Sequence, residues 1–465
     1  MDVNKIRHGC DSEDVRRGND NAAQLLTNSS SLVQAHAIFD PIFAPVRRLP
    51  AELLAKIFIE CIPFETSLFS DDEMHPQQIR ARLGQVCRLW SAILNDEPGV
   101  WAILVLDFLL LPLEIVSLWI KRSKSHPLDV SLNSLNMDTR DAIVSMLHKE
   151  LWRIRSFFVQ NSIDYYDTLP LFPSDLSTEA PMMQSLTIQC DGSIPELHLG
   201  CIRCPQLRTL TLWNCDKAVE HLFPKPLQNL RVLTIIDHHG DDMLYIKLLQ
   251  ALPNLVSLRW SNAGPLLHDV IPRVVLRSLK SLTFESCLWE TTKRLLTHLD
   301  IPSLEHLDLE HCRVVNAHPG ALNMILDVIC SDGAAQLRRL TLGDRALRRA
   351  NWHAMWHPLK HLETLSISGA HGIAPVNELF ISLSPSNRDF SSVCPQLKTL
   401  ELDLPGKIST DALVNFVQRR VKSDLGDPAP GLVTCLKLSY MMLVDDEVSA
   451  QLAKTHSLSV HLPRY

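Results

Sequence analysis

Two groups of residues in this chain are of the types that bind metals or assist hydrolysis. Residues 237–242 read DHHGDD, which places oxygen and imidazole ligands in one short run. A metal site, however, needs three or four ligands that converge in space. His353, His357 and His361 share a spacing of four residues, but no HExxH motif occurs and Pro358 would break the helix needed to align them. We therefore expect no metal, and a metal-dependent hydrolase is the weakest hypothesis.

A third candidate is the CxxC formed by Cys201 and Cys204, which lacks the second cysteine pair of a zinc site. Residues 204–207 read CPQL, and the same four letters recur at 394–397. A recurring turn explains the motif better than redox chemistry. The chain also holds no GxxxxGK[ST], GxGxxG or GxSxG motif and no kinase signature. We expect no catalytic residues, no cofactor and no enzyme activity.

Composition excludes further classes. Of the 465 residues 46% are hydrophobic, and the net charge of −7 argues against a nucleic-acid or anionic-membrane partner held by bulk electrostatics. The amino-terminal segment is too polar for a signal peptide, so we expect the 12 cysteines to be reduced thiols in the cytoplasm or nucleus. Residues 100–120 are almost wholly apolar, but Asp107, Pro112 and Glu114 interrupt them. This pattern favours a buried strand followed by a helix over a membrane span.

The elements that position every other side chain come from a repeat. The unit L-x-x-L-x-L begins at eight clear places: Leu207, Leu230, Leu255, Leu279, Leu304, Leu337, Leu362 and Leu397. The first five copies begin 23 to 25 residues apart, and looser copies begin at Ile154, Met183 and Val433. This period is typical of leucine-rich repeats, in which each unit contributes one short strand and stacking buries the apolar face. We predict an α/β leucine-rich-repeat solenoid over residues 106–465, with a curved parallel sheet and helices outside.

The register of this solenoid follows from the repeat. The middle leucines of the units should form one buried ladder, comprising Leu210, Leu233, Leu258, Leu282, Leu307, Leu340, Leu365 and Leu400. Cys215, Cys287 and Cys312 follow three of the units at one position, where a small buried thiol packs and does no chemistry.

The alternate side chains of these strands should face away from the core. Most are small and polar, and simple solvation explains most of them. Trp213 is the exception, since an aromatic in a polar row resembles an interface anchor. We predict that a protein substrate binds this face at Trp213, Arg259, Glu285, Asp308 and Glu310, the acidic trio favouring a basic ligand. The alternative is binding at the carboxyl-terminal end or at the inserts 383–393 and 423–431.

The amino-terminal part differs from the repeats. We expect residues 1–40 to be disordered or weakly helical, followed by a helical segment over residues 41–105. There, two stretches place apolar residues at helical spacing: first Leu49, Leu53, Leu54, Ile57, Phe58 and Cys61, then Ile79, Leu83, Val86, Cys87, Trp90, Ile93 and Leu94. Pro50 suits a first helical turn, and Pro98 with Gly99 ends the second helix. Spacing alone also fits an ordinary helical hairpin.

The residue types go further. Leu49-Pro50, Glu52-Leu53-Leu54, Ile57-Phe58, Val86-Cys87-Arg88, Trp90 and Trp101 together resemble an F-box, with flanking sequences similar to F-box-like proteins of mushroom-forming basidiomycete fungi. The long acidic link at residues 62–78 is a departure from that pattern. The resemblance implies docking to a Skp-family adaptor, and through it to a cullin. The residues that it assigns to adaptor binding are Leu49, Pro50, Leu53, Leu54, Ile57, Phe58, Val86, Cys87, Trp90 and Trp101.

Together these expectations describe a substrate-recruiting F-box subunit of a Skp–cullin–F-box ubiquitin ligase, with ubiquitin transfer performed by other subunits. The alternative is a leucine-rich-repeat scaffold that acts without ubiquitin transfer.

Overall fold

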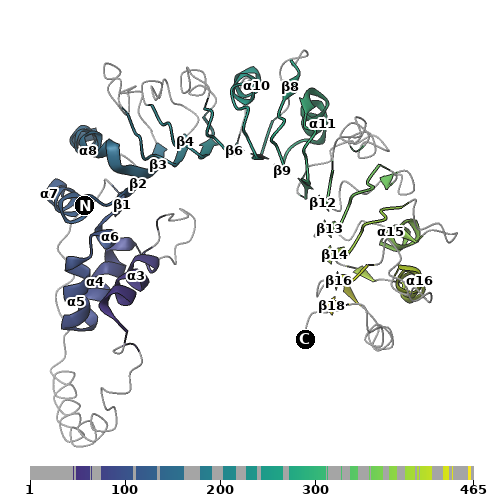
Figure 1. Cartoon of the computed structure of the whole chain (residues 1–465), viewed down its shortest axis with the longest axis horizontal. Helices are drawn as coiled ribbons and strands as arrows, with labels where there is room; N and C mark the ends of the chain where they lie inside the picture. Colours follow the sequence, from purple (N-terminus) through teal and green to yellow (C-terminus); the bar gives the residue numbers. More distant parts are fainter. Residues whose placement is uncertain are drawn as a thin grey trace, which may run out of the picture. The chain divides into compact units, whose positions relative to one another are not determined.

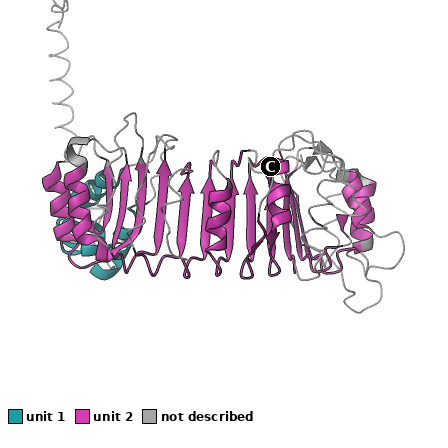
Figure 2. Ribbon diagram, turned by 90° about the horizontal axis from the view of Figure 1, so that it is seen from above, with its two compact units in different colours: residues 1–63, 70–100 teal, residues 64–69, 101–465 magenta. Residues whose placement is uncertain are grey.

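The computed structural model contains two compact units, one of residues 1–63 and 70–100 and one of residues 64–69 and 101–465 (Figure 2). We call them unit 1 and unit 2. The residues that the structure describes are 46, 49–62, 64, 75–107, 112–133, 137–161, 179–190, 203–215, 227–237, 242–264, 272–310, 312, 326, 336–343, 355–356, 358–369, 376–384, 393–403, 406–407, 409–420, 433–438, 442–443 and 459–461. The expected segment 1–40 and the insert 423–431 lie outside them.

Unit 1 is helical, and the chain passes from it into unit 2 within a fourth short helix. Its helices are α3 (Ala51–Glu60), α4 (Pro76–Val86), α5 (Arg88–Asp96) and α6 (Pro98–Trp101). Pro50 precedes the first turn of α3 as its N-cap residue, so the prediction that it lies within that turn is corrected by one position.

The second predicted helix is two helices. Cys87 adopts an extended conformation, with φ −163° and ψ 168°, and separates α4 from α5. Gly84 lies in the last turn of α4, where glycine disfavours a helix. The hydrophobic spacing did not reveal the break because the apolar pattern continues across it, with Leu83 and Val86 before Cys87 and Trp90, Ile93 and Leu94 after it.

Unit 2 contains one parallel sheet of 14 strands. In spatial order these are β1 (Ile103–Asp107), β2 (Leu128–Asn133), β3 (Ile154–Asn161), β4 (Ser185–Cys190), β5 (Thr209–Trp213), β6 (Val232–Ile236), β7 (Ser257–Ser261), β9 (Ser281–Glu285), β11 (His306–Leu309), β12 (Arg339–Gly343), β13 (Thr364–Ser368), β14 (Thr399–Asp403), β16 (Cys435–Leu438) and β18 (Ser459–His461). Two short parallel pairs, β8 (Val274–Val275) with β10 (Leu299–Asp300) and β15 (Gly406–Lys407) with β17 (Met442–Leu443), lie apart from it.

The described helices of unit 2 follow individual strands and lie on one side of the sheet, and none of them lies on the opposite side (Figure 1). They are α7 (Leu113–Arg122), α8 (Met137–Glu150), the 3-10 helix η3 (Leu151–Arg153), α10 (Asp242–Gln250), α11 (Trp289–His298), α15 (Val376–Leu383) and α16 (Thr410–Arg420). We call the side without helices the open face. The prediction of an α/β architecture with a large parallel sheet and helices beside it is confirmed.

The register of the strands is also confirmed. Leu210, Leu233 and Leu258 pair directly across β5, β6 and β7, and the ladder continues without a slip to Leu400 in β14. All eight predicted ladder leucines are at most 1% exposed. Because side chains alternate along a strand, this register places every intervening residue on the open face.

The described part of the apolar run of residues 100–120 contains β1 and the start of α7, as expected, with Pro112 as the N-cap of the helix. Within the described ranges no helix is both long enough and apolar enough to span a membrane.

The three repeat cysteines are structural, as predicted. Cys215, Cys287 and Cys312 are buried, and each thiol donates to a backbone carbonyl of the preceding strand, respectively Ile188 (3.3 Å), Trp260 (3.1 Å) and Phe284 (3.6 Å). Burial raises the pKa of Cys312 to about 12, which keeps the thiol protonated and unreactive at neutral pH.

Candidate protein-binding surfaces

Unit 1 exposes large hydrophobic side chains that its own core does not use. Leu53 and Ile57 on α3 are 45% and 44% exposed, Val86 at the end of α4 is 59% exposed, and Leu89 in α5 is 52% exposed. Val46, before α3, is 38% exposed. We call these five residues the apolar surface of unit 1.

The local sequence explains why this surface remains open. Leu54 and Phe58 point into the core, where Phe58 packs against Trp90 with ring centroids 4.8 Å apart. Leu53 and Ile57 each directly precede one of these two core residues and are also four positions apart, so they form a second stripe on the same helix. An isolated layer of short helices covers only one of these two stripes.

A buried arginine ties the core of unit 1 together. The Arg80 guanidinium in α4 donates from Nε to the carbonyl of Val100 at 3.1 Å, and burial lowers its pKa to about 10. Gly99 packs closely beside it, since an added Cβ would approach Cδ1 of the Ile59 side chain to 2.7 Å and that side chain would have to move. These contacts position α3 and α4, and with them the exposed side chains.

The residues that the sequence assigned to adaptor binding thus fall into three groups. Leu53, Ile57, Val86, Pro50 and Cys87 are exposed. Leu49, Trp90 and Trp101 are half-buried. Trp101 belongs to unit 2, and the Arg122 guanidinium lies 4.5 Å from the centroid of its ring. Leu54 and Phe58 are buried, so their part is to hold the exposed stripe in place. Sequence reasoning missed Leu89 and Val46.

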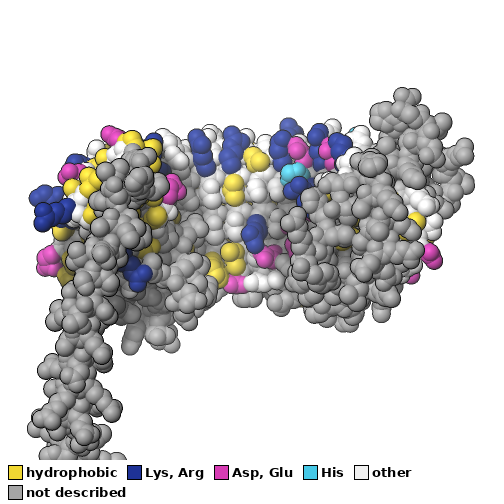
Figure 3. Space-filling model, turned by 90° about the horizontal axis from the view of Figure 1, so that it is seen from below, with side chains coloured by type: hydrophobic (Ala, Val, Ile, Leu, Met, Phe, Trp, Pro, Cys, Tyr) yellow, Lys and Arg dark blue, Asp and Glu magenta, His cyan; other side chains and the backbone are white. Residues whose placement is uncertain are grey.

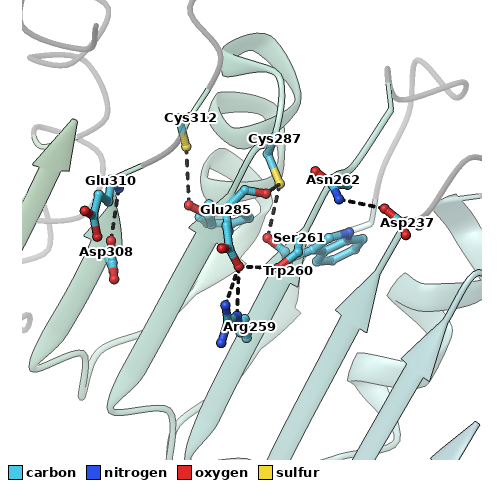
Figure 4. A network of polar contacts seen from close by, with 11 residues as sticks. Asp237, Arg259, Trp260, Ser261, Asn262, Glu285, Cys287, Asp308, Glu310 and Cys312 are labelled. Atoms are coloured by element: carbon cyan, nitrogen blue, oxygen red, sulfur yellow. Dashed lines mark hydrogen bonds and ion pairs between the residues drawn. The ribbon is translucent and has the colours of Figure 1, made fainter. Parts of the chain in front are cut away.

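On the open face of unit 2, the structure brings Arg259 and Glu285 together. The Arg259 guanidinium on β7 forms an ion pair with the Glu285 carboxylate on β9, with its Nε 3.1 Å from Oε2 (Figure 4). The hydroxyl of Ser261 donates to the same oxygen at 3.0 Å. Glu285 is therefore already engaged by a cation, which reduces its pull on a basic ligand.

Trp213 lies at the end of β5, half-buried, and its indole N–H donates to the carboxylate of Asp237. Asn262 donates to the other oxygen of Asp237 at 2.6 Å. Asp237 and Asn262 both have positive φ, 53° and 54°, a conformation that Asn and Asp tolerate better than most residues. The indole is thereby fixed in orientation, as an anchor in an interface should be.

Glu310 is held differently. Its carboxylate accepts a 2.6 Å hydrogen bond from Ser368 on β13, reaching across β12. Gly343 ends β12 next to it, and any Cβ there would overlap the backbone carbonyl of Glu310. Asp308 accepts from the backbone N–H of Glu310 at 3.0 Å. Glu310 is thus oriented by its neighbours.

The five predicted substrate-binding residues lie on one face but not in one contact group. Arg259 and Glu285 touch, and Asp308 with Glu310 form a second pair on and just after β11. Trp213 is separated from Arg259 by the whole of β6. Ile236 on β6, which pairs with Trp213, is the apolar neighbour that sequence reasoning missed; the cross-strand register supplies that signal.

The metal-binding candidates lie only partly within the described residues. Asp237 is occupied by Trp213 and Asn262, whereas residues 238–241, His353, His357 and Cys201 fall outside those ranges. In the part of the chain that the structure describes, no three His, Cys, Asp or Glu side chains gather as a metal site requires. Cys204 contacts the sulfur of Met183 at 3.6 Å, and burial raises its pKa to about 12.

Comparisons with known proteins give little beyond this geometry. No protein-family model and no curated protein matches the chain. Among solved structures, the crystal structure of a TLR13–ssRNA13 complex is similar at 16% sequence identity, covering 72% of this chain and 67% of that chain, with a TM-score of 0.21. A likeness of this size assigns neither a ligand nor a function.

Proposed function

We propose that this protein is a substrate-recruiting F-box subunit of a Skp–cullin–F-box ubiquitin ligase of the cytoplasm or nucleus. In this proposal unit 1 binds a Skp-family adaptor, and through it a cullin, while the repeats of unit 2 bind a protein substrate. The protein itself carries out no catalysis and needs no cofactor or metal.

The observation that carries the proposal is the apolar surface of unit 1. Contiguous exposed hydrophobic side chains on a soluble protein usually mark an interaction site. Leu53 and Ile57 are neighbours on one helical stripe, and they belong to the residues through which the F-box resemblance expects adaptor contact. An ordinary hairpin packed inside a domain would bury both stripes of α3.

The substrate side of the proposal rests on the open face. Trp213 offers an apolar, oriented anchor, and Arg259, Glu285, Asp308 and Glu310 offer charge on neighbouring strands. Repeat proteins commonly bind partners across such extended strand surfaces.

The test is co-purification of the full chain with a Skp adaptor. The variant Leu53→Ala/Ile57→Ala should lose the adaptor while its melting temperature stays near that of the parent, because exposed side chains contribute little to stability. The matched control is Leu118→Ala, which removes an exposed leucine of similar accessibility, 43%, from unit 2. Adaptor capture by the double variant at the parental level would refute the proposal.

The alternative is a repeat scaffold that binds the adaptor, or another partner, without ubiquitin transfer. Adding the cullin to the purified pair separates the two. Capture of all three proteins supports the ligase, and capture of the adaptor alone supports the scaffold.

A further inference from the structure

The residues immediately before ten strands of the unit 2 sheet form a row along one edge of the sheet, where the strands begin, and seven of the ten are charged. Figure 3 shows Lys and Arg side chains along this edge, with Asp and Glu among them toward one end. Backbone hydrogen bonds connect the row directly: the N–H of Arg231 donates to the carbonyl of Arg208 at 2.8 Å, and Glu305 to Lys280 at 2.9 Å. In order along the sheet the row reads Gln184, Arg208, Arg231, Val256, Lys280, Glu305, Arg338, Glu363, Lys398 and Thr434.

Most cations in this row are neutralised by their neighbours. Lys280 pairs with Glu305 at 2.8 Å. Glu363 pairs with both Arg338 and Lys398, at 3.5 Å and 3.3 Å. The charged residues from Lys280 to Lys398 therefore largely neutralise one another.

Arg208 and Arg231 differ from the rest of the row. They are adjacent and exposed, and among the described residues neither forms an ion pair with a carboxylate. Neighbouring parallel strands lie about 4.8 Å apart, so two arginines of like charge extend from adjacent positions, and both line the same hollow. Such an arrangement is unfavourable by itself and becomes favourable when an anion lies between the two groups.

The surface around the two arginines is hollowed. A cavity of about 290 Å³ is lined by Gln206, Arg208, Asn229 and Arg231. Arg231 is anchored by a 3.1 Å hydrogen bond from Nη1 to the carbonyl of Asn254, and Asn229 donates to the carbonyl of Pro205 at 2.6 Å. The walls of the hollow are therefore tied to the turns between strands. Among the residues that the structure describes, the other guanidinium N–H groups of Arg208 and Arg231 have no hydrogen-bond partner.

We propose that this hollow binds an oxyanion carried by a partner protein, either a phosphate or a carboxylate group. Arginine suits both, because its planar fork of donors matches two oxygens at once. The site lies where the strands begin, and it is distinct from the open-face residues described above. It concerns unit 2 alone, so it stands whether or not unit 1 binds an adaptor.

The experiment compares three full-length proteins. These are the parent, Arg208→Gln/Arg231→Gln, and the matched control Lys280→Gln/Lys398→Gln, which removes two edge cations that are already paired. The probes are inorganic phosphate and short labelled Gly/Ser peptides that carry a central phosphoserine, glutamate or serine. Binding is measured by fluorescence anisotropy, with phosphate as competitor and ionic strength held constant with NaCl.

We expect at least one anionic peptide to bind the parent more tightly than the serine peptide does. That binding should fall about tenfold or more in the arginine variant, since two charge-assisted contacts are lost, and change little in the control. Preference for phosphoserine identifies the phosphate group, and equal binding of glutamate identifies the carboxylate. Phosphate that displaces the peptide shows that the anion itself is recognised. Equal weakening in both variants, or no preference for either charged peptide, would overturn the proposal.

Discussion

The two units treat their large hydrophobic side chains in opposite ways. Unit 2 buries its leucines in a ladder that continues from strand to strand, and its open face is mostly small and polar. Unit 1 contributes five of the nine large hydrophobic side chains that are exposed in the described residues, although it is much the smaller unit.

The difference has a simple physical origin. A repeat has a neighbour on each side, so stacking covers its apolar face and leaves polar residues to recognise a partner. Three short helices have too few neighbours to cover every apolar stripe, and most helical stability comes from such packing. Under the proposed function, unit 1 would offer a hydrophobic surface to its partner, and unit 2 a polar and charged one.

The largest effect should come from breaking the ladder. Leu307→Ala removes a side chain that is 1% exposed and lies between Leu282 and Leu340. Its loss should lower the free energy of unfolding by about 2–5 kcal/mol, the range for truncating a buried leucine. Urea denaturation followed by circular dichroism measures it. The control is Leu53→Ala in unit 1, which should change stability by no more than about 0.5 kcal/mol because the side chain is exposed. Equal costs for the two variants would contradict the comparison.

A smaller loss is expected at Gly343. The substitution Gly343→Ala introduces a Cβ that overlaps the carbonyl of Glu310, so the backbone of β11 or β12 must shift. We expect a destabilisation of about 1–3 kcal/mol, as for other overpacked sites. Gly84→Ala is the matched control, because its Cβ would meet Leu94 Cδ1 at an ordinary 3.6 Å. An unaltered denaturation midpoint for Gly343→Ala would show that the strand ends are not held as described.

The polar recognition assigned to unit 2 can be tested on its open face. The variant Trp213→Ala/Glu285→Ala/Asp308→Ala/Glu310→Ala should weaken capture of partner proteins by about tenfold or more, since a buried aromatic anchor alone often contributes that much. Quantitative affinity proteomics on the full chain measures it.

Two comparisons sharpen that result. Glu401→Ala removes an open-face carboxylate of β14, which pairs at 2.6 Å with Lys437 of the neighbouring strand β16. Strand β14 lies three positions beyond β11 in the sheet, so the variant should leave capture unchanged. Deletion of 385–392 tests the alternative that the insert binds the partner. It keeps Leu383 and Val393, which are buried and whose carbonyls accept from Arg420. If the variant with all four substitutions captures every partner as the parent does, the assignment of substrate binding to the open face is wrong.

Much of unit 2 was predictable from sequence because its repeat fixes both position and direction. Once Leu307 is inward, Asp308 must be outward, and each neighbouring strand follows in the same register. The contacts between open-face residues were not predictable. Asp237 receives hydrogen bonds from Trp213 and Asn262, which are 24 and 25 positions away, and only the pairing of strands brings them together.

For unit 1 the sequence predicted helices but not which apolar stripe is covered. Leu53 and Leu54 have the same residue type and adjacent positions, yet one is 45% and the other 1% exposed. Hydrophobic spacing describes the helix and not its neighbours, so it cannot separate the two. The break between α4 and α5 at Cys87 was not predicted for a related reason, because the apolar pattern continues across it.

The most direct test of the proposed division of roles uses the cysteines of unit 1 as reporters. Cys61 and Cys87 are exposed, and Cys87 directly follows Val86 of the apolar surface. Their alkylation by iodoacetamide is followed by mass spectrometry with and without saturating Skp adaptor, with half-buried Cys435 of unit 2 as the internal control.

Cys312, with its pKa raised to about 12, should stay unmodified throughout and so report that the protein remains folded. We predict that the adaptor slows alkylation of Cys87 and leaves the rate at Cys435 unchanged. Equal rates at Cys87 with and without the adaptor would contradict the claim that this surface of unit 1 is the docking site.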